Sequence, residues 1–119
     1  MIYVIGLGFV GLTTAVGFAK KGSDVVGIDN NIDKLNNLKN NIIEFHEPHL
    51  KDFFISVCKK KKLILHQEIN IKNEENYYFI CVGTPSKSDG SIDISLINEV
   101  IKKIVKNINR IKNKKKIIL

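Results

Sequence analysis

Apolar positions along this chain follow two spacings that take turns from one end to the other. Short runs in which nearly every residue is apolar are typical of strands buried in a sheet, and they lie at residues 2–5, 24–29, 62–66, 77–82 and 114–119. Apolar residues three or four positions apart are typical of a helix with one buried face, and they lie at residues 10–21, 32–40, 49–60 and after Asp93. The pattern predicts strands that alternate with helices.

Residues near the predicted helix ends support these boundaries. Lys20 and Lys21 followed by Gly22 are typical of a helix C-terminus. Pro48 suits the first turn of the helix that follows the irregular stretch at 44–50. Asp93 can cap the last helix, whose apolar stripe consists of Ile97, Val100, Ile101, Ile104 and Ile108.

Strand–helix alternation of this kind predicts right-handed βαβ units and a doubly wound α/β fold with a parallel sheet. The strand expected at 77–82 is apolar on both faces, as an interior strand of such a sheet requires. The 119 residues have the length of one domain, and no repeat or low-complexity linker divides them. We therefore expect a single domain over residues 1–119.

The stretch IGLGFVGL (residues 5–12) places the pattern G-x-G-x-x-G between the first predicted strand and the first predicted helix. In a Rossmann-type sheet Gly6 allows the tight turn, Gly8 lets the backbone approach a pyrophosphate, and Gly11 lets the helix pack close to the strand. The N–H groups near Phe9 and Val10 would face the anion at the positive end of the helix. This context predicts a dinucleotide site.

Asp29 stands at the end of the second predicted strand. A carboxylate there accepts hydrogen bonds from an adenosine ribose and repels a 2′-phosphate. Asn30 and Asn31 follow it, so no arginine is in place to hold such a phosphate. The expected cofactor is therefore NAD rather than NADP. The competing interpretation is a turn that merely favours glycine, followed by an acid that merely caps the next helix.

The distribution of charge, the length of the apolar runs and the cysteine spacing argue against a nucleic-acid-binding, membrane-spanning or secreted protein. The net charge of +7 comes mainly from KKKK at 59–62 and RIKNKKK at 110–116. We interpret these runs as solvated ends of helices and not as a nucleic-acid surface, because no aromatic residues interleave with them.

No apolar run reaches the roughly 20 residues that cross a bilayer, and the N-terminus has no basic signal-peptide region. Cys58 and Cys81 lack metal or redox spacing, which favours a reducing cytoplasm.

Two further stretches make the pattern more specific, namely EFHEPHL at 44–50 and CVGTPSKSDGSIDIS at 81–95. Together with IGLGFVGL and VVGID, they closely resemble the N-terminal domain of the UDP-glucose/GDP-mannose dehydrogenases, among them UDP-glucose 6-dehydrogenase. The resemblance runs in order over essentially the whole chain. It implies an enzyme of polysaccharide precursor synthesis that oxidises the C6 alcohol of a nucleotide sugar to a carboxylate with two NAD molecules.

The resemblance implies cofactor-binding residues in three segments. Those of the pyrophosphate loop are Gly6, Gly8, Phe9, Val10 and Gly11. Asp29 matches the ribose-binding acid, and Lys34 matches a lysine on the adenosine side, although a solvated lysine is an equal alternative. The turn beside the nicotinamide ribose matches Val82, Gly83, Thr84 and Pro85, for which a plain proline-containing turn is the weaker alternative.

The resemblance also implies what these residues lack. The catalytic cysteine and lysine of the family, and most of its nucleotide-sugar pocket, lie in a later domain. We therefore expect a fragment with no catalytic residue and no metal ligand, with weak NAD binding at most, from an enzyme that forms a homo-oligomer. Cys58 and Cys81 are expected to be small core residues, and His46 and His49 to be surface or packing residues.

Two other classes remain as alternatives. One is a regulatory nucleotide-sensing module such as those of potassium transport systems, which also begin with a glycine loop and an acid. The other is the N-terminal domain of a β-hydroxyacid dehydrogenase, which shares the first glycine pattern. The stretches EPHL and GTPSKSDGS are not expected in the first class, and Asn30 stands where NADP-using members of the second would have an arginine.

Overall fold

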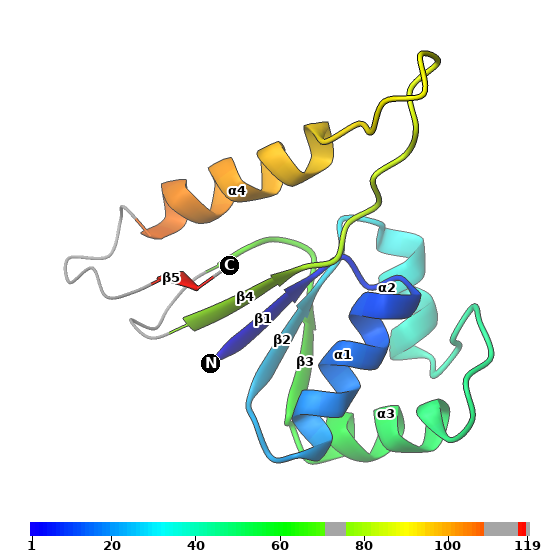
Figure 1. Ribbon diagram of the computed structural model, residues 1–119. Helices are drawn as coiled ribbons and strands as arrows, with labels where there is room; N and C mark the ends of the chain where they lie inside the picture. Colours follow the sequence, from blue (N-terminus) through cyan, green and yellow to red (C-terminus); the bar gives the residue numbers. More distant parts are fainter. Residues whose placement is uncertain (71–75, 109–116, 119) are drawn as a thin grey trace.

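Five parallel strands form one sheet in the order β3-β2-β1-β4-β5 (Figure 1). The computed structural model describes residues 1–70, 76–108 and 117–118. The strands are β1 (Ile2–Ile5), β2 (Val25–Ile28), β3 (Leu63–His66), β4 (Asn76–Ile80) and β5 (Ile117–Ile118). The helices are α1 (Phe9–Lys20), α2 (Ile32–Lys39), α3 (Leu50–Lys59) and α4 (Ser95–Ile108). This strand order is that of a Rossmann-type sheet, so the predicted fold class is confirmed.

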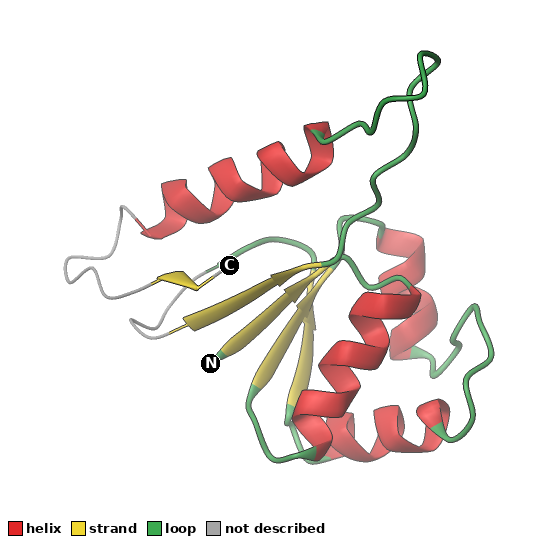
Figure 2. Ribbon diagram, viewed as in Figure 1, coloured by secondary structure: helices red, strands yellow, loops and turns green. Residues whose placement is uncertain are grey.

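The helices form two layers, one on each face of the sheet. Figure 2 shows α1, α2 and α3 on one face and α4 on the other. One core cluster lies on the first face and includes Val4, Leu12, Val25, Leu35 and Phe54. The second lies between α4 and the sheet and consists of Tyr3, Ile5, Val26, Ile28, Tyr78 and Ile104, each buried. The sheet is thus covered from both sides, as a doubly wound fold requires.

Most predicted boundaries are correct to within one residue, but Pro48 is not in the first turn of a helix. Helix α3 begins at Leu50, and His49 before it has a left-handed backbone with φ of 63°. The turn at Pro48 and His49 therefore redirects the chain before the helix begins. Gly22 does end α1 as predicted, with φ of 97°, and Asp93 accepts a hydrogen bond from the backbone N–H of Ser95 (2.9 Å) at the start of α4.

The strand predicted at 77–82 is shorter than expected, and one of its faces is not buried. Strand β4 ends at Ile80, opposite Ile5, because β1 ends there and the chain turns at Gly6. Cys81 and Val82 therefore lie in the loop after the strand. Tyr77 and Phe79 are 50% and 37% exposed, because α1 covers only part of this face. The prediction of an apolar strand buried on both sides was wrong here.

The last predicted strand, at 114–119, is described only at Ile117–Ile118, which pairs with Asn76 and Tyr77 of β4. The remainder of that strand and the basic run at 110–116 lie outside the described residues. The other basic run begins at the last residue of α3; Lys62 forms an ion pair with Asp24 (2.8 Å), and the lysines before it are exposed. Within the described residues, no helix has the length and apolarity needed to span a bilayer.

Candidate functional site

Gly6 and Gly11 are required because the backbone at each position packs directly against the backbone of another segment. Gly6 has φ of 91°, and a Cβ on it would lie 2.7 Å from the carbonyl oxygen of Cys81. A Cβ on Gly11 would overlap the carbonyl oxygen of Gly6. The loop after β1, the first turn of α1 and the end of β4 therefore meet backbone to backbone, and any side chain at these two positions would separate them.

Gly8 differs from these two, because a Cβ there would meet no protein atom within 4 Å. It caps α1 without a side-chain hydrogen bond, and the first turn of α1 contains no acidic residue. The first N–H groups of a helix have no acceptor within the helix and carry its positive end. The open space at Gly8 and these N–H groups fit a pyrophosphate, which needs close approach and hydrogen-bond donors.

Asp29 lies directly after β2 and is almost fully buried, with 6% of its surface exposed. Its Oδ2 accepts hydrogen bonds from the backbone N–H of Leu7 (2.8 Å) and from Nζ of Lys34 (2.9 Å). Its Oδ1 accepts a hydrogen bond from the backbone N–H of Asn31 (3.0 Å). The carboxylate therefore ties the glycine loop, through Leu7, to the start of α2, a role that the sequence did not indicate.

The same contacts decide the ionisation of Asp29. Burial by itself would raise the pKa of this carboxyl. The hydrogen bonds from Lys34 and from the backbone of Asn31 and Leu7 outweigh burial and hold the pKa below its usual value. Asp29 is therefore an anion at neutral pH, with acceptor capacity left for a hydroxyl group.

A cavity of about 250 Å³ joins these features at the carboxyl ends of the strands. Six of the residues predicted from the sequence line it, namely Gly6, Gly8, Asp29, Lys34, Val82 and Gly83. The carboxyl end of a parallel sheet, where the strand order reverses beside β1, is the usual place for ligands in such folds. The structure therefore brings the first loop, the acid and the turn after β4 into one space.

Five predicted residues do not line this cavity. Gly11 is buried against Gly6. Phe9 and Val10 are 52% and 62% exposed at the start of α1, where the ring of Phe9 contacts that of Phe45 edge to face (5.0 Å between centroids). Thr84 and Pro85 are exposed in the loop that follows Gly83.

Helix α4 supplies a wall of the cavity that sequence reasoning missed. Its residues there are Leu96, Glu99, Val100 and Lys103. Val100 was predicted only as part of an apolar stripe, and Lys103 stands beside that stripe. A charged residue next to the apolar stripe of the helix that follows the glycine-containing turn was the available signal. Ile5, Ile28, Asn30 and Cys81 complete the lining.

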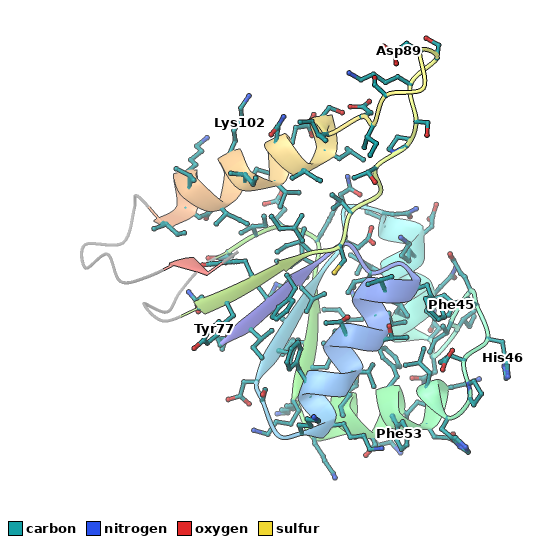
Figure 3. The ribbon with its side chains drawn as sticks, viewed as in Figure 1. Phe45, His46, Phe53, Tyr77, Asp89 and Lys102 are labelled. Atoms are coloured by element: carbon teal, nitrogen blue, oxygen red, sulfur yellow. The ribbon has the colours of Figure 1, made fainter. Side chains whose placement is uncertain are left out.

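The cysteines and histidines behave as predicted. Cys58 and Cys81 are free thiols, half-buried and packed against the core. Burial raises the pKa of Cys58 to about 11 and also raises that of Cys81, so neither is a ready nucleophile. His46 and His49 are exposed, and His46 points away from the body of the protein (Figure 3). No cluster suited to a metal ion occurs among the described residues.

Comparisons with known proteins agree with this geometry. A family model described as the NAD binding domain of the UDP-glucose/GDP-mannose dehydrogenase family matches residues 1–119. The chain is 36% identical over 111 residues to UDP-glucose 6-dehydrogenase of Rickettsia bellii and 36% identical over 108 residues to UDP-N-acetyl-D-mannosamine dehydrogenase of Methanococcus maripaludis. These alignments cover 92% and 87% of this chain but 25% of each relative, so the chain spans about a quarter of their length.

Solved structures give the same relationship. GDP-mannose dehydrogenase from Pseudomonas aeruginosa superposes with a TM-score of 0.83 at 25% identity, over 98% of this chain and 27% of its own. UDP-N-acetyl-mannosamine dehydrogenase from Staphylococcus aureus gives a TM-score of 0.80 at 34% identity, over 88% of this chain and 25% of its own. The names of the relatives thus agree on nucleotide-sugar dehydrogenases and differ in the sugar.

Proposed function

The chain belongs to the UDP-glucose/GDP-mannose dehydrogenase family, whose domain of this type binds NAD, and from that premise we propose what the whole protein does. We propose that residues 1–119 are the NAD-binding domain of a homo-oligomeric, cytoplasmic enzyme. That enzyme would oxidise the C6 alcohol of UDP-glucose, or of a related nucleotide sugar, to the carboxylate. The free thiols of Cys58 and Cys81 support a reducing compartment.

One observation carries the proposal: the open space at Gly8 and the ionised Asp29 face the same cavity. Gly8 and Asp29 are far apart in the sequence. The hydrogen bond from the backbone N–H of Leu7 to Asp29 (2.8 Å) holds the glycine loop next to the acid. A dinucleotide needs both groups together, because its pyrophosphate and its adenosine ribose are adjacent.

We assign roles within the proposed site as follows. The N–H groups of the first turn of α1, at Phe9 and Val10, bind the pyrophosphate over Gly8, while Gly6 and Gly11 hold the loop against β4. Asp29 accepts hydrogen bonds from the adenosine ribose, and Lys34 lies beside it on the adenosine side. The turn at Val82, Gly83, Thr84 and Pro85 positions the nicotinamide ribose. When bound, NAD supplies the hydride acceptor.

Titration calorimetry of the chain with NAD and, separately, with NADP tests this proposal. We expect saturable binding of NAD and much weaker binding of NADP, because Asp29 repels a 2′-phosphate. Circular dichroism of the same sample shows whether the chain is folded. Because weak NAD binding at most is expected of residues 1–119 alone, the longer protein is titrated in the same way, and a folded longer protein that binds neither dinucleotide would contradict the proposed site.

A pair of valine substitutions locates the pyrophosphate. Gly8→Val places a side chain in the open space of the cavity and should abolish NAD binding. Gly17→Val is the matched control, because Gly17 is exposed in the same helix and a Cβ there also meets nothing within 4 Å. Equal NAD affinity of the two variants would remove Gly8 from the site.

Asp29→Ala tests the ribose contact. It should weaken NAD binding and reduce the preference for NAD over NADP, since the repulsion of the 2′-phosphate is lost. Unchanged affinities for both dinucleotides would remove Asp29 from the site. The sugar is a separate question, which NADH production by the longer protein with UDP-glucose, GDP-mannose and UDP-N-acetylmannosamine would answer.

A further inference from the structure

A small cavity of about 100 Å³ lies beside Gly8 on the face of the sheet that carries α1 and α2. It shares Gly8 and Lys34 with the cavity at Asp29, and it is too small for a nucleotide. The rest of its lining is mostly apolar and consists of Leu7, Leu12, Leu38, Ile42, Ile43, Glu44 and Phe45. The segment 42–45, between α2 and α3, therefore forms a wall next to the glycine loop.

The start of α1 has little support from its own side chains. Gly8 caps the helix without a side-chain hydrogen bond, and helix ends fray unless other contacts hold them. Gly11 fixes the far end of the first turn against Gly6. Phe9, at the beginning of that turn, meets Phe45 instead, ring edge to ring face with 5.0 Å between centroids. This is a favourable arrangement for two aromatic rings, so Phe45 holds Phe9 in place.

Phe45 is itself well anchored. It is half-buried and packs against the core cluster on the α1 face. Its segment is attached to the end of α2, because the backbone N–H of Ile42 donates to the carbonyl oxygen of Asn37 (2.8 Å) and Nδ2 of Asn37 donates to Oε1 of Glu44 (3.3 Å). The start of α2 is bonded to Asp29. Contacts thus run from Asp29 along α2 to the segment 42–45 and back to α1, around Gly8.

We propose that Phe45 is a positioning residue for NAD, which acts through the ring of Phe9. Neither side chain lines the cavity at Asp29, so the effect is indirect. The contact fixes the first turn of α1 before the cofactor arrives, and binding then costs less ordering of the N–H groups that face the pyrophosphate. This inference rests on the proposed function, because it needs a pyrophosphate over Gly8.

Titration calorimetry of NAD with the longer protein that contains residues 1–119 tests the role of Phe45. Phe45→Leu keeps an apolar side chain in the segment but removes the ring that meets Phe9. NAD binding should weaken by about 2- to 10-fold. Phe53→Leu is the matched control: Phe53 lies on α3, away from the segment of Phe45 (Figure 3), and lines neither cavity. It should leave NAD affinity unchanged.

A double substitution shows whether Phe45 acts through Phe9. Phe9→Leu keeps the backbone N–H at this position and removes only the ring, so it should weaken NAD binding as much as Phe45→Leu. The two substitutions together should be no weaker than either alone, because they remove one and the same contact. Urea denaturation of each variant separates this from a merely structural role, which would lower the free energy of unfolding and leave the NAD affinity of the folded protein unchanged.

The outcomes separate this inference from the proposed function. NAD affinities of Phe45→Leu and Phe9→Leu equal to that of Phe53→Leu would overturn the positioning role, and so would losses that add in the double variant. NAD binding by the unmodified protein would in both cases still support the proposed function. Since Phe9 is half-exposed, Phe9→Leu gives a folded variant even if Phe45→Leu does not. A folded, unmodified longer protein that fails to bind NAD would overturn the proposed function, and the role of Phe45 with it.

Discussion

On one face of the sheet, α1 buries Gly11, Leu12, Ala15, Val16 and Ala19. On the other face, α4 is longer and its apolar stripe is clear in the sequence, yet Ile104 is its only fully buried residue over Ser95–Ile108. The difference follows from side-chain size. Glycine and alanine let α1 approach the strands closely, whereas the apolar stripe of α4 consists of isoleucine and valine, with no glycine or alanine in the helix.

The looser packing of α4 leaves the space that a ligand needs. The cavity of about 250 Å³ and a neighbouring cavity of about 330 Å³ both lie beside α4, at Val100 and Lys103. The closely packed face instead fixes the backbone of the glycine loop, through Gly6 and Gly11. One face of the sheet thus positions the loop, and the other provides room beside it. The following predictions test this difference, in order of decreasing effect.

Gly11→Ala should have the largest effect, because its Cβ would overlap backbone that cannot move without separating α1 from β4. We expect the free energy of unfolding to fall by about 5 kcal/mol, because a backbone overlap this close displaces the whole helix; urea denaturation followed by circular dichroism measures this loss. Gly17→Ala in the same helix is the control, and it should be neutral or stabilising by up to about 1 kcal/mol. Equal stability of the two variants would contradict the close approach of α1.

Leu12→Ala and Ile104→Ala compare the two faces directly, since both side chains are at most 2% exposed. Leu12 is enclosed by rigid neighbours, so its removal should cost about 4 kcal/mol. Ile104 lies under a helix that can move toward the sheet and fill the space, so we expect about 2 kcal/mol there. Urea denaturation measures both values, and a larger cost at Ile104 would reverse the comparison.

Asp29→Asn tests the electrostatic link between the loop and α2. At pH 7 the variant should lose about 1–2 kcal/mol of unfolding free energy, because the bond from Lys34 loses its anionic acceptor. The pKa of Asp29 is lowered in the folded protein, so its contribution is complete above the ordinary value of 3.8 and is lost as the pH falls through the lowered value. A difference between the two proteins that stayed constant from pH 7 to pH 2 would contradict this assignment.

Val105→Gln should have the smallest effect. Val105 lies next to Ile104 in α4 but is 44% exposed. Its replacement should change the free energy of unfolding by no more than about 0.5 kcal/mol, as thermal or urea denaturation would show. A loss comparable to that of Ile104→Ala would mean that this side of α4 is packed against other residues.

The parts of the site that could be predicted are those specified by short stretches of sequence. Strand, glycine loop, helix and acid all lie within residues 2–29, and each has a local signature in its spacing or its residue type. Lys34 follows on the next helix, where it pairs with Asp29 (2.9 Å), and its place on the adenosine side of the cofactor stays a prediction.

The parts that could not be predicted depend on residues far apart in the sequence. The continuous apolar run at 77–82 predicted burial on both faces of the strand, but Tyr77 is half-exposed because no helix covers it among the described residues. The same holds for Lys103, whose place in the wall of the cavity at Gly8 and Asp29 depends on how α4 packs against the sheet.

The sequence by itself determined the order of strands and helices, the glycine loop and the acid beside it, because hydrophobic periodicity and backbone requirements act within a few residues of each position. Only the tertiary structure decided that Asp29 anchors Leu7 (2.8 Å), that Gly11 packs on Gly6 and that α4 forms a wall of the cavity beside Asp29. These contacts depend on how closely separate elements approach one another, and that distance is a property of the packed sheet as a whole.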